Sequence, residues 1–316
     1  MWLLITIFAY LLNAVAMVVD KTLLKKEIEN PVVYAFYIAF LGAVIMLAVL
    51  PFFLFLPSAT DFFVSLLAGA AFAFALVLMF MSLKKDDASR VTPMIGGLVS
   101  IFVLFFASFL VSEKLTVDQY LGAFLLFIGT ILISFDLGKS FNHNSDIKKI
   151  SFKVLPQIRN TLWLALSAAL FFAFSHVLSK YVYDQITFWP GFIWTRFGAF
   201  LTVLLMFIVK DNRRALINSF KKSRNSSSGA RTGGLLIFGQ FCGGSSAFLV
   251  QYATALSLVS LVQALQGIQY VFVFALVIIL TKFYPRVLKE KLSKEVVWQK
   301  ISALFLICLG LYLVAF

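Results

Sequence analysis

The chain has 316 residues, a length that would suit two soluble domains, but 61% of them are hydrophobic and only 13% are charged, against about 25% charged in a soluble domain. This composition excludes an ordinary soluble globular protein, because too few polar groups remain to cover its surface, and it predicts that lipid is the solvent. The formal net charge of +13 could suggest nucleic acid, but the charges lie in short segments between apolar stretches, so we interpret them as topology signals and expect no nucleic-acid partner.

Ten apolar stretches follow one another along the chain. A helix needs about 20 apolar residues to cross about 30 Å of hydrocarbon, and a bilayer core without water forces each segment to close its own backbone hydrogen bonds. We therefore predict an all-α integral membrane protein with ten transmembrane helices. The expected spans are residues 2–19, 32–56, 62–83, 92–111, 117–135, 162–182, 189–209, 233–256, 258–281 and 297–316.

Three features of the connecting sequence define the expected boundaries. The small residues 14–16 could mark a signal-peptide cleavage site, but no basic residue precedes the apolar run and Lys21 follows it, so we expect a retained span. Two longer polar, turn-rich segments, 136–160 and 210–232, are expected to be solvated connectors. The expected organisation is a first five-helix repeat in residues 1–138, a polar connecting loop in residues 139–160 and a second five-helix repeat in residues 161–316.

The two halves share short patterns in the same order. The matching patterns are Lys21 with Pro31 and Lys180 with Pro190, each ten residues apart; residues 89–91 with Gly96 and residues 260–262 with Gly267; and residues 113–116 and 290–293, each preceding an apolar stretch. Thr116 and Ser293 also suit helix N-caps, so capping chemistry alone could explain part of the last match. A duplicated unit with five helices must sit inverted in the membrane, and transporters built this way bind their cargo between the repeats.

The basic residues predict the orientation of the chain. The odd-numbered connections between the expected spans hold 23 of the 27 Lys and Arg residues. Basic residues favour the cytoplasmic side. We therefore expect these connections in the cytoplasm and, with ten spans, both termini outside.

The motifs resemble the drug/metabolite transporter superfamily, of the EamA type. The residues that carry the resemblance are 88–93, 112–116, Gln119, Gly122 and Gly129, repeated more loosely in 255–257, 260–267 and 290–293. The resemblance covers nearly the whole chain and implies a ten-helix inverted-repeat transporter with a central cavity. Members of the superfamily move amino acids, metabolites, nucleotide sugars or drugs, and they usually keep both termini in the cytoplasm, opposite to the orientation that the charge bias predicts here.

Arg196 is the charged residue placed deepest in a predicted span. It follows Pro190 by six residues, roughly 9 Å at 1.5 Å per residue. An Arg at a helix centre costs roughly 2.5–3.5 kcal/mol on insertion scales. It could face a cavity and bind a carboxylate or phosphate, or it could bond helix carbonyls or interfacial water. Trp194, which is close by, could stack on cargo or pack against neighbouring helices.

Other polar residues inside predicted spans are further cavity candidates. His176 could titrate and couple transport to protons, or hydrogen-bond between helices, and Asn13 has the same two interpretations. Gln263, Gln266 and Tyr270 share one face of the predicted helix 258–281 because they are spaced i, i+3 and i+7. Such a face suits a polar or zwitterionic cargo, although amides in lipid also join helices.

Several chemistries have no pattern in this sequence. The sequence places no Asp or Glu at mid-span, and it contains no metal-ligand cluster, phosphate loop or ATPase signature. His176 has Ser175 and Ser179 nearby but no further converging catalytic group. We therefore expect no enzyme, no catalytic residues, no metal and no cofactor.

The sequence as a whole predicts a secondary transporter that carries a small anionic, zwitterionic or polar metabolite by alternating access. A flippase of lipids or lipid-linked sugars with the same fold is the alternative, because basic cytoplasmic connections would suit anionic head groups. The expected partners are a small-molecule substrate and the bilayer, with a homodimer left open. The expected location is a prokaryotic inner membrane.

Overall fold

The computed structural model describes residues 1–23, 30–53, 55–85, 88–134, 154–224, 229–283 and 294–315. These residues form α-helices and no strand. The helices are α1 (Trp2–Leu23), α2 (Pro31–Phe53), α3 (Ala59–Leu83), α4 (Ala88–Leu110), α5 (Val117–Ser134), α7 (Val154–Ile186), α8 (Phe188–Met206), α9 (Lys210–Arg224), α10 (Gly229–Leu256), α11 (Val259–Ala264), α12 (Gly267–Phe283) and α13 (Lys294–Ala315).

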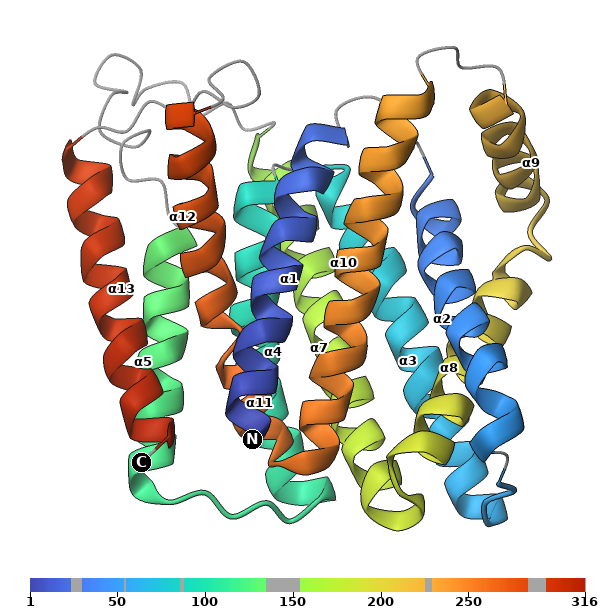
Figure 1. Ribbon diagram of the computed structural model, residues 1–316, viewed down its shortest axis with the longest axis horizontal. Coiled ribbons are helices and arrows are strands. Elements are labelled where there is room, and N and C mark those ends of the chain that lie inside the picture. The colour runs from blue at the N-terminus through green and yellow to red at the C-terminus, as the bar shows by residue number, and fades with distance from the viewer. Residues whose placement is uncertain are drawn as a thin grey trace.

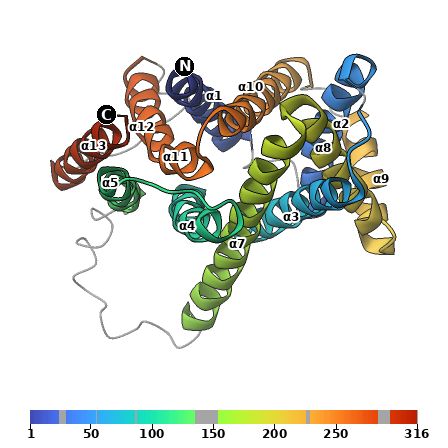
Figure 2. The same cartoon turned by 90° about the horizontal axis from the view of Figure 1, so that it is seen from below.

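The long helices run up and down side by side, and the labelled chain ends lie at the same end of the bundle (Figure 1). Seen end-on, α7 crosses the middle of the bundle, with α5 and α13 at one edge and α2, α8 and α9 at the other (Figure 2). The most extensive contacts join α3 to α7, α1 to α10 and α5 to α13. Segments far apart in the sequence are therefore direct neighbours.

Glycines allow the backbones of α3 and α8, and those of α5 and α13, to approach closely. A Cβ on Gly69 of α3 would lie 2.1 Å from the carbonyl oxygen of Thr195 on α8, and a Cβ on Gly198 would lie 2.7 Å from the Cα of Leu66. Across the α5–α13 contact, a Cβ on Gly310 would lie 2.7 Å from the carbonyl oxygen of Gly122. Small residues let helix backbones approach where lipid supplies little hydrophobic driving force for association.

Helix α5 begins with a reciprocal cap. The amide of Gln119 donates to Thr116 Oγ1 at 3.3 Å, and the amide of Thr116 donates to Gln119 Oε1 at 3.1 Å. Each side chain satisfies an amide that the helix leaves without a partner. The predicted N-cap at Thr116 is confirmed, whereas Ser293 lies outside the described residues.

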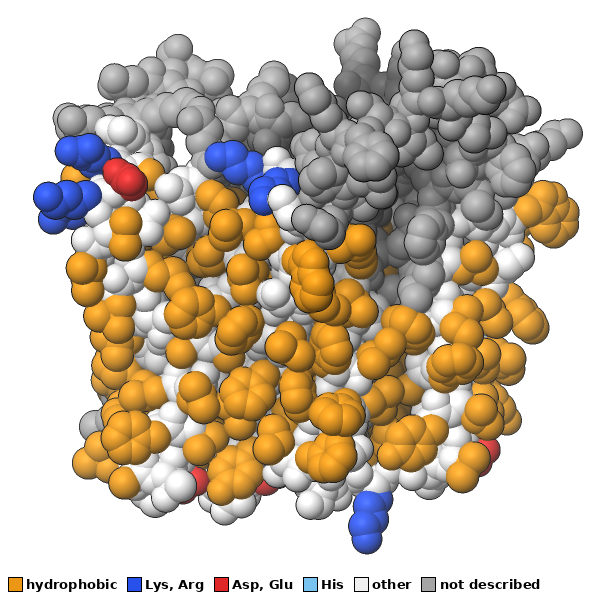
Figure 3. All heavy atoms as spheres, turned by 180° about the vertical axis from the view of Figure 1, so that it is seen from behind, with side chains coloured by type: hydrophobic (Ala, Val, Ile, Leu, Met, Phe, Trp, Pro, Cys, Tyr) orange, Lys and Arg blue, Asp and Glu red, His pale blue; other side chains and the backbone are white. Residues whose placement is uncertain are grey.

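The surface carries a broad apolar band. Figure 3 shows hydrophobic side chains over the middle of the molecule, with most of the visible basic side chains near one end. Among the described residues, five segments are long and apolar enough to cross a membrane, namely Trp2–Val19, Pro31–Phe53, Ala59–Leu83, Asn160–Ile186 and Phe188–Met206. Shorter apolar helical segments are Met94–Leu110, Val117–Gly129, Val259–Val273 and Ile301–Val314. The all-helical, apolar architecture is confirmed, while the number of crossings and the inversion of the halves stay predictions.

Three helix boundaries differ from the expected ones. α7 begins at Val154, inside the expected connector 136–160. The segment 210–232, expected to be a turn-rich connector, contains the helix α9, and α10 already begins at Gly229. The predicted single helix 258–281 is divided into α11 and α12. At the break the amide of Gln266 bonds the carbonyl of Gln263 at 3.1 Å, and the amide of Ile268 bonds that of Leu265 at 3.0 Å. These three-residue bonds tighten the turn locally and interrupt the α-helical ladder.

Candidate functional site

Arg196 lies inside the helix bundle on α8. Its guanidinium carbon is 5.1 Å from the centre of the Phe72 ring and 5.0 Å from that of Phe192. Gly42 of α2 leaves room for its stem, since a Cβ there would lie 3.3 Å from Arg196 Cδ. Two aromatic faces attract a cation electrostatically, so Arg196 is held by rings and helix backbone.

The charge of Arg196 has no carboxylate partner among the described residues. Among the described residues, the one ion pair joins Lys180 to Asp184 at 2.8 Å. The Nε of Arg196 is buried and has no hydrogen-bond partner. A guanidinium keeps its proton and offers five N–H donors, and an unpaired buried charge is costly. The arrangement leaves a cation with donor capacity to spare.

A cavity of about 10 Å³, the space of about one water molecule, adjoins this cation. Its lining comes from α3, α7, α8 and α10 and comprises Ala68, Gly69, Phe72, Ser175, Ser179, Thr195, Arg196, Ala199 and Gln251. Two of the hydroxyl groups are already used, because Ser175 Oγ donates to the carbonyl of Ala68 at 2.8 Å and Thr195 Oγ1 to that of Phe192 at 3.0 Å. Gln251 Oε1 is buried without a partner. Arg196 and Gln251 therefore hold the unused polar atoms at this cavity.

His176 lies next to this group on α7. Its ring stacks on Phe172 with centroids 6.4 Å apart, and Phe172 meets Phe72 edge-on at 5.7 Å. Its Nδ1 is buried without a hydrogen-bond partner, and the imidazole is within electrostatic reach of Arg196. A row of aromatic rings thus connects His176 with the cation.

Trp194 lies outside the cavity lining. Its indole Nε1 donates to the carbonyl of Phe55 at 2.9 Å, and its ring meets Phe62 edge-on at 5.0 Å. These contacts fasten α8 to the connection between α2 and α3. These contacts support the packing interpretation of Trp194.

Gln263, Gln266 and Tyr270 form a second polar group at the break between α11 and α12. Tyr270 Oη donates to the carbonyl of Thr92 on α4 at 2.9 Å. Gln263 Nε2 and Gln266 Oε1 are buried without partners. Gly96 gives them space, since a Cβ there would lie 2.6 Å from Tyr270 Oη. The cavity beside Arg196 does not include these residues.

Asn13 belongs to a third polar contact, between α1 and α12. Its Nδ2 donates to Gln269 Oε1 at 2.8 Å, and Gln269 Nε2 contacts the sulfur of Met17. Asn13 therefore makes an interhelical hydrogen bond, which is one of the two interpretations that the sequence left open. The predicted site residues are therefore distributed over four places: Arg196 with His176, Trp194 at the α2–α3 connection, the group at the α11–α12 break, and Asn13.

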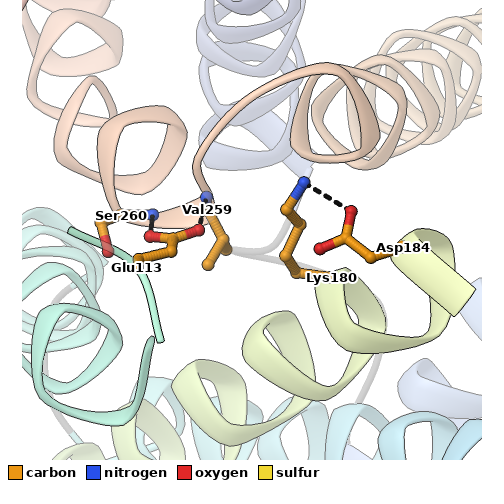
Figure 4. Close-up of polar contacts among 5 residues, drawn as sticks. All are labelled: Glu113, Lys180, Asp184, Val259 and Ser260. Atoms are coloured by element: carbon orange, nitrogen blue, oxygen red, sulfur yellow. Dashed lines mark hydrogen bonds and ion pairs between the residues drawn. The ribbon is translucent and has the colours of Figure 1, made fainter. Parts of the chain in front are cut away.

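Glu113 makes a long-range contact that its position near the end of a predicted span did not indicate. It follows Ser112, whose φ is 54°, in the connection between α4 and α5. Its buried carboxylate accepts hydrogen bonds from the amides of Val259 at 2.7 Å and Ser260 at 3.2 Å, at the start of α11. Figure 4 shows this contact beside the Lys180–Asp184 pair of α7. A carboxylate at a helix N-terminus satisfies free amides and favours the helix dipole.

No group of three or more His, Cys, Asp or Glu side chains that could hold a metal ion occurs in the described ranges. The unpartnered polar atoms of the candidate site are the donor Nε of a guanidinium, an imidazole nitrogen and the acceptor oxygen of a carboxamide. Such a set suits recognition of a polar or negatively charged group by hydrogen bonds and charge.

Comparisons with known proteins concern the family and the fold. Residues 1–135 match the model of the EamA-like transporter family, and no curated protein matches the chain. Several solved structures match, among them one titled "Crystal structure of protein" with 13% sequence identity and a TM-score of 0.67 over 99% of this chain and 95% of that chain. At that identity the likeness concerns the fold alone. The family match and the apolar helices identify an integral, multi-pass membrane protein.

Proposed function

We infer, from the premise that residues 1–135 are an EamA-like transporter segment, that the chain is a secondary transporter of a small metabolite. The cargo would carry a negative, zwitterionic or strongly polar group and would cross by alternating access. No step of this function requires catalysis, so we propose that the chain is not an enzyme.

The observation that carries the proposal is the buried guanidinium of Arg196, with an unpartnered Nε, beside a cavity of about 10 Å³. In this conformation the cavity has room for about one water, so cargo would enter in a more open state of the alternating-access cycle. In the described chain no carboxylate forms an ion pair with this guanidinium. A charge kept inside a membrane protein is costly, and a cargo carboxylate or phosphate would supply the missing partner. His176 Nδ1 would donate a hydrogen bond to the same anionic group, whereas the unpaired Gln251 Oε1 accepts and would suit an ammonium or hydroxyl group of the cargo. Gln263, Gln266, Tyr270, Asn13 and Trp194 would act at other points of the path or in packing.

The arrangement of the helices supports an inverted repeat of residues 1–138 and 161–316 around the connector 139–160. If the halves correspond in order, α1 pairs with α7, α3 with α10 and α5 with α13. Under this correspondence the α3–α7 contact is equivalent to the α10–α1 contact, and both are among the most extensive in the fold. The α5–α13 contact joins two corresponding helices, so it is its own equivalent. The cavity lining then combines α3 of one repeat with α7, α8 and α10 of the other, as expected for a site at a repeat interface.

Ten membrane crossings would place all five odd-numbered connections on one side. Their basic residues favour the cytoplasm for that side, which leaves both termini outside. We propose a prokaryotic inner membrane as the location, with a small solute and the bilayer as partners and a homodimer as a possible assembly. Protease or thiol accessibility from each side of the membrane tests the orientation.

The experiment that tests the function compares solute movement with lipid movement. Purified protein is screened for thermal stabilisation by negatively charged, zwitterionic and neutral metabolites, and the stabilising solutes are labelled for uptake into proteoliposomes. The same vesicles report the transfer of labelled lipid between leaflets. Saturable solute uptake without lipid transfer supports the transporter. Lipid transfer without solute uptake would favour the flippase and contradict the proposal.

A further inference from the structure

Helix α9 has a basic face. Lys210, Arg213 and Arg214 are exposed and fall on one side of the helix, and in the sequence Lys221 and Arg224 continue the same spacing. Positions i, i+3, i+4, i+11 and i+14 lie on one face of an α-helix. Lys210, Arg213 and Arg214 therefore form a basic patch on this face, which also carries Ile217 at i+7.

The other side of α9 is held against the protein. Ser219 and Tyr37 of α2 share a hydrogen bond of 3.0 Å between their hydroxyl groups, and Asn212 Nδ2 donates to the carbonyl of Met206 at 2.9 Å. Ala215 and Leu216 on this side are half-buried. Because one side is fixed by these contacts, the basic face is turned away from the bundle.

The position of α9 matches the edge of the apolar band. The helix lies beside α2 at the end of the bundle opposite the chain termini (Figure 1), the end at which basic side chains gather in Figure 3. Exposed apolar side chains accompany the cations: Ile208 is 76% exposed, Val209 55% and Ile217 48%. A helix that combines a basic face with exposed apolar groups at this depth has the chemistry of the membrane interface.

We propose that the basic face of α9 binds anionic phospholipid head groups of the adjoining leaflet. The phosphates would neutralise Lys210, Arg213 and Arg214, while the lipid chains would cover Ile208, Val209 and Ile217. In the part of the chain that the structure describes, none of the three cations forms an ion pair with a carboxylate. A soluble polyanion would satisfy the charges but leave the apolar side chains in water. The inference does not depend on the identity of the cargo.

The test measures lipid binding to the full chain in detergent by native mass spectrometry, with phosphatidylglycerol or phosphatidylcholine titrated in. The variant is Arg213→Gln/Arg214→Gln. The matched control, Lys84→Gln/Lys85→Gln, removes the same charge from an exposed pair after α3. At about 1 kcal/mol for each basic residue near an anionic surface, we expect the α9 variant to bind phosphatidylglycerol about 30-fold more weakly. Lys84 and Lys85 face the same leaflet in the proposed orientation, so the control measures the loss that two basic residues outside α9 cause, and that loss should be clearly smaller. Phosphatidylcholine should bind weakly to all three proteins.

Two further measurements test whether charge and acyl chains are both needed for binding. Arg213→Lys/Arg214→Lys keeps the charge and should retain phosphatidylglycerol binding, while an unchanged melting temperature shows that each variant is folded. Soluble glycerol phosphate should compete poorly, because it lacks acyl chains. Equal losses in the α9 variant and the control, loss in the Lys variant, or equal binding of glycerol phosphate and the lipid would each overturn the proposal.

Discussion

Replacing Glu113 should loosen the contact between the connection from α4 to α5 and the start of α11. The carboxylate accepts two backbone hydrogen bonds, at 2.7 and 3.2 Å, from Val259 and Ser260, which are 0% and 1% exposed. A hydrogen bond to a charged group contributes about 1.5–3 kcal/mol. Taking the lower figure for each bond, Glu113→Ala should weaken the contact by about 3 kcal/mol. Glu113→Gln keeps one neutral acceptor and should lose roughly half as much.

The loss should appear as exposure of the α11 start. In alternating access the two repeats separate on the side that opens, and Glu113 joins the first half of the chain to the second. A destabilisation of about 3 kcal/mol raises the open population about 100-fold while that state is rare. The assay is the rate of maleimide labelling at Ser260→Cys in detergent, after Cys242 and Cys308 have been replaced by Ser. The exposed Asp118, in the first turn of α5, provides the control variant Asp118→Asn.

The expected order of labelling rates is Glu113→Ala, then Glu113→Gln, then the parent protein and Asp118→Asn together. The reasoning is refuted if both Glu113 variants label at the parent rate. It is equally refuted if Asp118→Asn accelerates labelling as much as Glu113→Ala, because a general loss of negative charge would then explain the effect.

Two other substitutions probe packing. Gly69→Ala should lower the melting temperature strongly, because its Cβ would meet backbone atoms of α8 at 2.1 and 2.5 Å and force the helices apart at a cost of about 1–3 kcal/mol or more. Gly234→Ala is the control and should not lower the melting temperature, since nothing lies within 4 Å of its Cβ. Equal melting temperatures of the two variants would contradict the close approach. Trp194→Phe should lower the free energy of unfolding by about 1 kcal/mol or less, through loss of the hydrogen bond to Phe55, and leave the KM for uptake unchanged. A raised KM would instead place Trp194 at the cargo site, and Trp163→Phe, at an exposed position, is the control.

Elements that depend on local pattern could be predicted from the sequence. Apolar length indicated where the long helices lie, and Thr116 before an apolar stretch suited an N-cap that the structure contains. The helix α9 was missed because its polar composition suggested a solvated connector, although its basic residues recur at helical spacing. The break after Ala264 was missed because apolar composition does not distinguish one continuous helix from two joined by tight turns.

The candidate site was predictable only in part. Arg196 stood out because a charge inside an apolar stretch is costly wherever it points. The sequence could not separate its surroundings from those of Gln266 or Asn13, since each is a polar residue in an apolar helix. Glu113 stood out as part of a repeated motif, but its contact could not be predicted because its partners lie 146 and 147 residues away. Contacts of that range depend on how the helices assemble, which local spacing does not encode.

The charge requirement at Arg196 is the most direct test of the proposed function. Uptake into proteoliposomes is measured for a transported anionic solute and for its neutral amide, with the parent protein, Arg196→Gln and the control Lys85→Gln at an exposed site. Removing one partner of a buried charge pair costs about 2–5 kcal/mol, so Arg196→Gln should reduce kcat/KM for the anion at least about 30-fold. It should reduce uptake of the amide far less, and Lys85→Gln should transport both solutes normally. Undiminished uptake of the anion by Arg196→Gln would contradict the account.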